Sequence, residues 1–209
     1  MSIVHKKTRG RPPKEEAARI ASRQAMIEAA LDLLREGGSA ALTARAVSER
    51  SGAAIGSVYG AFDNLETLKF EANAVTMRLL RDHLSGALAA CPATGAAERL
   101  LCLADAYLGF ARAHHHAWAA LFDRRSIEAP PAIAADIAAL FALIESVLAE
   151  LPGVEPASIP VLAKALWSSV HGMVYLGETG GLGPVGPQDI PAMVETLVRA
   201  TVRGFERPA

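Results

Sequence analysis

The chain has 209 residues, of which 51% are hydrophobic and 21% charged, so it can bury a sizeable core and does not have the composition of a disordered protein. Its net charge of −1 conceals an uneven distribution: residues 1–70 hold eleven Lys and Arg against eight Asp and Glu, whereas residues 71–209 hold ten against fourteen. A polyanionic partner is therefore expected at the N-terminal end. Cys91 and Cys102 lack CxxC spacing, which indicates neither a disulfide framework nor a zinc finger and favours a reducing cytoplasm.

No segment predicts a membrane span or a signal peptide. The longest uncharged, mostly apolar run, residues 165–177, is shorter than the roughly 20 residues that cross a bilayer, and it contains His171. The basic N-terminal residues are not followed by the apolar run of a signal peptide. We therefore expect a soluble, cytoplasmic protein with no membrane partner.

Residues 1–18 are basic, lack helical periodicity and contain Pro12-Pro13, which predicts a mobile arm. Within it, Arg9, Gly10 and Arg11, followed by Pro12, resemble the core of an AT-hook. In such a module, extended arginine side chains enter the narrow, strongly negative minor groove of A·T-rich DNA. The alternative is a solvated basic tail with only diffuse attraction to phosphate.

A helix is expected over residues 19–35, because apolar residues recur there in steps of three and four; Gly37-Gly38 ends it. Two shorter helices follow, over residues 44–51 and 54–61, with Gly52 at the turn between them. Thr43 is the expected N-cap of the first. A helix, a glycine turn and a second helix are typical of helix-turn-helix DNA binding. The residues expected to face inward are Met26, Ile27, Ala30, Leu31, Leu34, Val47, Val58 and Phe62.

The rest of the chain predicts only helices. A long helix capped by Asp63-Asn64 should run to about residue 89. Further helices are expected at about residues 96–114, 118–122, after Pro131, 157–176 and 191–205, with no alternating strand pattern and no internal repeat. The predicted fold is all-α, with an N-terminal three-helix domain that contains the helix-turn-helix and a helical C-terminal domain.

The helix-turn-helix segment resembles the DNA-binding signature of the TetR family of transcriptional regulators. The preceding helix from Arg23 and the segment from Asn64 fit as well, so the resemblance covers roughly residues 20–70. Ala61 and Leu65 depart from it, because family members usually carry a polar aromatic residue and a lysine there that touch phosphate. Positive charge from elsewhere, such as the arm, is then needed. The matching positions are Thr43, Arg45, Val47, Ser48, Ser51, Gly52, Gly56, Ser57, Val58, Tyr59 and Phe62.

Trp167, His171 and Gly172 resemble a C-terminal class of the same family that is marked by these three residue types. After the arm over residues 1–18, the resemblance implies a DNA-binding domain over 19–68 and a ligand-binding and dimerisation domain over 69–209. It also implies a ligand cavity among the C-terminal helices. A homodimer through the last two helices is expected for a second reason, since the apolar stripe of the final helix is wider than one packing partner needs.

Candidate DNA contacts follow from the resemblance and from residue chemistry. Arg45 can read guanine or be an ordinary surface charge, and Tyr59 can donate to phosphate because Val58 and Phe62 already fill the buried seam. Ile55 can only offer an apolar surface, to a thymine methyl or to the helix seam. The full candidate set is Arg9, Gly10, Arg11, Thr43, Arg45, Ala54, Ile55, Gly56, Ser57 and Tyr59.

Candidate ligand contacts are the aromatic residues of the C-terminal helices, which could equally fill the core. His171 is either a ligand contact or a core histidine bonded to a backbone carbonyl. The three consecutive histidines 114–116 point about 100° apart on a helix and cannot converge on one metal ion, so neither a metal nor another cofactor is expected. The set is Tyr107, Phe110, Trp118, Phe122, Phe141, Trp167 and His171.

The sequence thus favours a dimeric transcriptional repressor that binds a pseudo-palindromic operator in double-stranded DNA and is released by a small, mostly apolar effector. One alternative is a sensor or scaffold of the same fold that no longer binds DNA. Another is an all-α small-molecule enzyme, although the chain has no GxSxG, HExxH or phosphate-loop motif. We expect no enzymatic activity.

Overall fold

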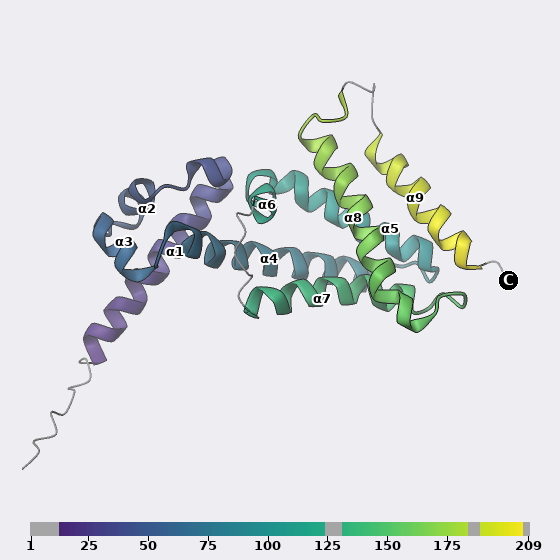
Figure 1. The fold of residues 1–209 in the computed structure, drawn as a ribbon, viewed down its shortest axis with the longest axis horizontal. Coiled ribbons are helices and arrows are strands. Elements are labelled where there is room, and N and C mark those ends of the chain that lie inside the picture. Colours follow the sequence, from purple (N-terminus) through teal and green to yellow (C-terminus); the bar gives the residue numbers. More distant parts are fainter. Residues whose placement is uncertain (1–12, 124–130, 184–188, 207–209) are drawn as a thin grey trace, which may run out of the picture. The chain divides into compact units, whose positions relative to one another are not determined.

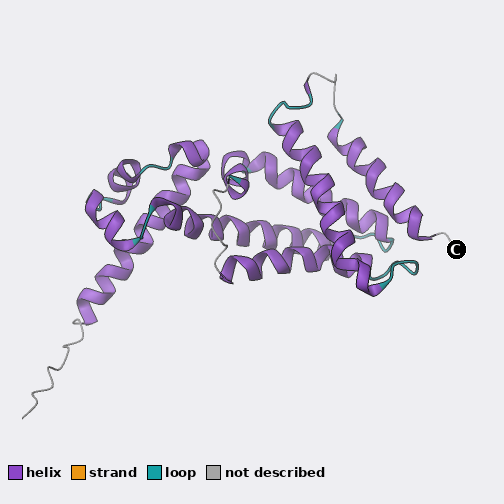
Figure 2. Ribbon diagram, viewed as in Figure 1, coloured by secondary structure: helices purple, strands orange, loops and turns teal. Residues whose placement is uncertain are grey.

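The structure, a computed structural model, describes residues 13–123, 131–183 and 189–206. Within these ranges the chain forms helices and turns but no strand (Figure 2). The predicted all-α fold is confirmed. The chain divides into two compact units, one ending at Ala72 and one beginning at Asn73, and helix α4 (Leu65–Ala90) contributes residues to both. None of the helices in the described ranges is long and apolar enough to cross a membrane.

The first unit, the head, is built on α1 (Pro13–Ala41), whose helical geometry is interrupted at Gly37 and Gly38. The predicted break is therefore confirmed. The start is earlier than predicted: residues 13–18, expected in the arm, are helical, because a proline is tolerated in the first turn, where its missing N–H has no partner to lose. The buried face of the head comprises Met26, Ile27, Ala30, Leu31, Leu34, Leu42, Val47, Val58, Phe62 and Leu68.

The helix-turn-helix consists of α2 (Ala44–Ser51) and α3 (Ile55–Ala61). Thr43 caps α2, since its Oγ1 accepts a hydrogen bond of 3.1 Å from the backbone N–H of Ala46. Gly52 has φ of +73°, in the left-handed region where glycine is preferred. The Ser48 hydroxyl donates to the Ala53 carbonyl at 2.6 Å and holds the turn. The predicted cap and glycine turn are confirmed.

The second unit contains the rest of α4 and the helices that pack around α5 (Ala96–Ala113). The others are α6 (His115–Phe122), α7 (Pro131–Leu148), a 3-10 turn (Pro156–Ser158), α8 (Ile159–Glu178) and α9 (Ile190–Glu206). Helix α5 packs against α6, α7, α8 and α9, and α8 also packs against α7 and α9 (Figure 1). The core therefore lies around α5.

Two sequence expectations about this unit are wrong. Cys91 and Cys102 form a disulfide, with their Cα atoms 6.3 Å apart. The chain leaves α4 at Ala90 and turns back into α5 at Ala96, so two cysteines without a recognised sequence spacing become neighbours in space.

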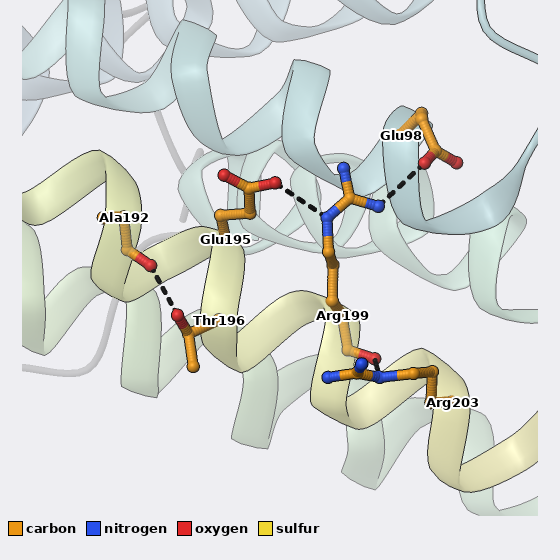
Figure 3. A network of polar contacts seen from close by, with 6 residues as sticks. All are labelled: Glu98, Ala192, Glu195, Thr196, Arg199 and Arg203. Atoms are coloured by element: carbon orange, nitrogen blue, oxygen red, sulfur yellow. Dashed lines mark hydrogen bonds and ion pairs between the residues drawn. The ribbon is translucent and has the colours of Figure 1, made fainter.

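The second wrong expectation is that the apolar stripe of α9 needs a packing partner from another protomer. Val194, Val198 and Val202 are at most 4% exposed within a single protomer, because α5 and α8 cover them. On the flank of α9, Arg199 donates to Glu98 of α5 at 2.9 Å and to Glu195 at 2.8 Å (Figure 3). The stripe is therefore part of the protomer core and is no evidence for a dimer interface.

Candidate functional site

Most residues of helix α3 are exposed. Of its residues, Val58 is buried and Ala61 is half-buried, whereas Ile55, Gly56, Ser57, Tyr59 and Gly60 are exposed, as is the preceding Ala54. Tyr59 is 56% and Ile55 48% exposed, although both are large and partly apolar. The head thus holds α3 by one buried valine and leaves the side chains predicted to contact DNA free to meet a groove.

Arg45 on α2 is the most accessible arginine of the described head. Its side chain is 82% exposed, against 35–56% for Arg19, Arg23, Arg35 and Arg50. It is paired only within its own helix, with Glu49 at 2.8 Å, and that hydrogen bond raises the pKa of the guanidinium. Such an exposed pair is weak and can be exchanged for a phosphate or a base.

Two other arginines of the head have structural roles that the sequence did not indicate. Arg23 forms a two-bonded ion pair with Glu71 and places its guanidinium 4.6 Å from the centre of the Phe62 ring. Arg50 donates to both carboxylate oxygens of Glu36, at 2.8 and 2.7 Å, which joins α2 to α1 and lowers the pKa of Glu36. These side chains position the helix-turn-helix. Arg9, Gly10 and Arg11 lie outside the described residues.

The second unit encloses a cavity of about 310 Å³. None of the described residues that line it carries a charge, and the wall combines aliphatic and aromatic side chains from α4, α5, α6, α7 and α8. A volume near 300 Å³ with an apolar wall suits a small organic ligand. The lining residues are Met77, Leu80, Leu84, Tyr107, Leu121, Phe122, Ile137, Leu140, Phe141, Ile144 and Trp167.

Tyr107, which lines the cavity, belongs to a chain of hydrogen bonds. The Trp118 indole N–H donates to the Tyr107 oxygen at 3.1 Å, and that oxygen lies 2.7 Å from Nδ1 of His171. Burial lowers the pKa of His171 and raises that of Tyr107, so both are neutral near pH 7. We therefore assign the Tyr107 hydroxyl as the donor to an unprotonated Nδ1, because the phenol proton then has an acceptor.

His171 is also surrounded by aromatic rings. It stacks on Trp167, with ring centres 4.9 Å apart and planes 9° apart, and lies 4.2 Å from the Phe122 ring. Its partner is thus a tyrosine side chain rather than the backbone carbonyl of the core-histidine alternative.

The predicted ligand residues divide into two groups. Tyr107, Phe122, Phe141 and Trp167 line the cavity, whereas Trp118 and His171 stand behind it. Phe110 instead packs against the rings of His83 and His114. The sequence reasoning missed the aliphatic wall, for which the signal was available: Met77, Leu80 and Leu84 recur in steps of three and four on the long helix.

Comparison with known families matches both units. The family model described as bacterial regulatory proteins, tetR family, matches residues 26–72. The model described as tetracyclin repressor-like, C-terminal domain, matches residues 100–201, which include Trp167, His171 and Gly172. This chain belongs to the TetR family of bacterial transcriptional regulators. The resemblance seen in the sequence is thereby confirmed.

Relatives of this TetR family chain match most of its length. The uncharacterised helix-turn-helix-type transcriptional regulator Rv0681 of Mycobacterium tuberculosis is 27% identical over 187 residues, which cover 89% of this chain and 82% of the relative. A Rhodococcus protein of unknown function has the same fold, with a TM-score of 0.72 at 19% identity over 89% of this chain and 96% of that one. FadR of Bacillus subtilis, solved with stearoyl-CoA, has a TM-score of 0.59 at 15% identity over 87% of this chain and 98% of that one.

Proposed function

We propose that this TetR family protein is a dimeric repressor that binds a pseudo-palindromic operator and leaves it when a small, mostly apolar molecule binds. The observation that carries the proposal is the exposed surface of α3 on a well-packed head. Each protomer would place α3 in a major groove, where Ser57 and Tyr59 bond phosphate or bases and Arg45 reaches a base edge. Ile55 would contact a thymine methyl, and Ala54 and Gly56 would let the backbone come close to the DNA.

The arm is part of this proposal because the head itself is not basic. Residues 13–72 hold seven Lys and Arg against nine Asp and Glu, a net charge of −2, whereas residues 1–12 hold four basic residues and no acidic one. We infer that Arg9 and Arg11 enter the minor groove beside each half-site. If three basic residues of each arm meet phosphate, deleting residues 1–12 should reduce the slope of log K against log[salt] by about 5 for the dimer.

A dimer is proposed through α8 and α9, on faces other than the buried stripe. Val161, 69% exposed, and Leu176, 42% exposed, stand at the two ends of α8, with small residues between them at helical spacing. Small exposed residues also follow one another on α9 every four positions, and small residues let two helices approach closely. These small residues are Ala165, Ser168 and Gly172 on α8, and Ala192, Thr196, Ala200 and Gly204 on α9.

The effector is proposed to occupy the 310 Å³ cavity. FadR of Bacillus subtilis shares the fold and was solved with stearoyl-CoA. The cavity here is roughly twice the ~150 Å³ that admits benzene, which corresponds to about ten to fifteen non-hydrogen atoms. We therefore propose a much smaller, uncharged effector. Effector and operator would favour different states of one protein, so each weakens the binding of the other by the same factor.

Because the net charge of −2 on the head does not favour contact with phosphate, one alternative is a sensor of the same fold that does not bind DNA. Fluorescence anisotropy with random and A·T-rich duplexes separates the two. A repressor should bind both weakly with a steep salt dependence and should enrich a defined sequence from a random pool. A protein that binds neither duplex at low salt would support the sensor.

A further inference from the structure

A second, smaller cavity of about 50 Å³ lies in the second unit beside the 310 Å³ cavity. Side chains of α4, α5, α7, α8 and α9 line it, and none of the described lining residues carries a charge. Protein cores contain few voids larger than a water molecule, and this one is larger. Among the residues that line this cavity but not the larger one are Ala104 of α5, Val170 of α8 and Val198 of α9.

The two cavities share one wall. A side chain that borders both spaces has one of them on each side, so along the shared residues the cavities are one side chain apart. Leu140 and Ile144 stand four residues apart on α7 and are only half-buried. This part of the wall therefore consists of aliphatic side chains that can change rotamer and open a passage. The shared residues are Leu84, Tyr107, Leu140, Ile144 and Trp167.

The smaller cavity has room for about two carbon atoms. On the scale in which ~150 Å³ admits the six carbons of benzene, 310 Å³ corresponds to about twelve non-hydrogen atoms and 50 Å³ to about two. Its wall is aliphatic apart from Tyr107 and Trp167, and the Tyr107 hydroxyl is already bonded to Trp118 and His171. A polar group would lose its hydration there, so the space suits a short hydrocarbon group.

We infer that the effector carries an alkyl group of about two carbons that passes between the shared side chains and fills the smaller cavity, an inference that rests on the proposed cavity site. The body of the effector occupies the larger cavity. The alkyl group gains dispersion contacts and leaves water, which favours its binding. It contacts Val170 and Val198, which lie on the buried faces of α8 and α9. The effector thereby touches both helices through which the dimer is proposed.

The test uses naphthalene and its 2-methyl, 2-ethyl and 2-butyl derivatives, measured by equilibrium dialysis against the full chain. The probes share one ring system, which fits the larger cavity, and differ only in the alkyl group. Burying one more carbon is worth about fourfold in affinity, so the wild-type protein should bind 2-ethylnaphthalene at least about tenfold more tightly than naphthalene. 2-Butylnaphthalene should bind no more tightly than 2-ethylnaphthalene, because its last two carbons exceed the available space.

Variants that change only the smaller cavity locate the alkyl group. Ala104→Val adds two carbons to its wall, so the gain from the ethyl group should fall to about threefold or less while naphthalene still binds. Val198→Ala removes two carbons and should bind 2-butylnaphthalene at least about fivefold more tightly than the wild type. The matched control is Val202→Ala, because Val202 is also 1% exposed on α9 but lines neither cavity. It should stay within about twofold of the wild type.

The outcomes separate this inference from the cavity proposal. Suppose that naphthalene binds and that Ile137→Trp, which fills only the larger cavity, blocks it. A gain from the ethyl group that is absent in the wild type, or unchanged in Ala104→Val, would then leave the larger site standing and overturn the alkyl inference. Equal effects of Val198→Ala and Val202→Ala would also overturn it, even if Ala104→Val does not fold. Failure of all the probes to bind would overturn both proposals.

Discussion

Arg45 and Glu49 form the exposed pair on α2 that DNA would have to separate. Arg45→Ala should weaken operator binding roughly 5- to 150-fold if the side chain reads a base. Glu49→Gln should have the opposite effect and tighten binding by up to about fivefold, because it releases Arg45 and removes a negative charge from the surface facing phosphate. Both are measured by anisotropy at fixed salt, alongside the thermal midpoint.

The control for this pair is Arg35→Ala, which removes an arginine paired with Asp32 on α1. It should leave affinity within about twofold. If Arg45→Ala and Arg35→Ala weaken binding equally, Arg45 acts only through net charge and does not read the operator.

His171 makes the stability of the second unit depend on pH. Burial lowers its pKa, so on acidification the unfolded chain takes up the proton first and the free energy of unfolding falls as pH drops below about 6.5. The slope is limited to about 1.4 kcal/mol per pH unit for one proton and vanishes once the folded protein is protonated too. Urea denaturation between pH 5 and 8 measures it, and His171→Gln, which can still accept from Tyr107, should flatten the slope in this window.

Glu36 and Glu98 do not interfere with that experiment. The pKa values of Glu36 and Glu98 are lowered by hydrogen bonds from Arg50 and Arg199, so the stability they contribute is present above their ordinary value of 4.5 and is lost only below it. A slope that is unchanged in His171→Gln would show that some other group titrates.

At the scale of elements, the turn between α2 and α3 depends on backbone conformation. Gly52 has φ of +73° and no atom within 4 Å of an added Cβ, so Gly52→Ala should cost about 1–2 kcal/mol of stability through strain alone. Gly60 also has open space but lies inside α3, where alanine is the better helix former. Gly60→Ala should therefore stabilise the head by about 0.5–1 kcal/mol. Equal effects of the two substitutions on urea denaturation would contradict this account of the turn.

These elements also show what could be predicted from sequence. Thr43, Gly52 and the four-residue spacing of Val58 and Phe62 are local signals. The bounds of these helices and the glycine turn were therefore predicted nearly correctly. The Cys91–Cys102 bond, the covering of Val198 by α5 and α8, and the partner of His171 arise from packing between distant segments, which no local period encodes. For the same reason, the aromatic residues alone did not reveal which of them line the cavity.

For the whole molecule, the proposed α8 and α9 interface can be tested at exposed positions. Val161→Glu with Ala165→Glu should leave each protomer folded, because both side chains are exposed, yet give monomers by placing like charges opposite one another across the twofold axis. We expect the dimer to be weakened about 100-fold or more in sedimentation. Val198→Glu is unsuitable as a test, because its 1% exposed side chain would bury a charge and unfold the unit.

Leu79→Glu is the matched control, an equivalent change at an exposed position of α4, 43% exposed. It should leave the dimer intact. A dimer that survives the α8 substitutions but not Leu79→Glu would place the interface on another surface.

Selection of DNA from a random duplex pool tests the claim that α3 and Arg45 read an operator most directly. The wild-type protein should enrich one pseudo-palindrome whose half-sites are about one helical turn apart, since a dimer places two recognition helices in successive major grooves. The double variant Arg45→Ala, Tyr59→Phe should lose that enrichment while its thermal midpoint stays unchanged. Enrichment of no sequence by the wild type, or of the same sequence by the double variant, would contradict the assignment.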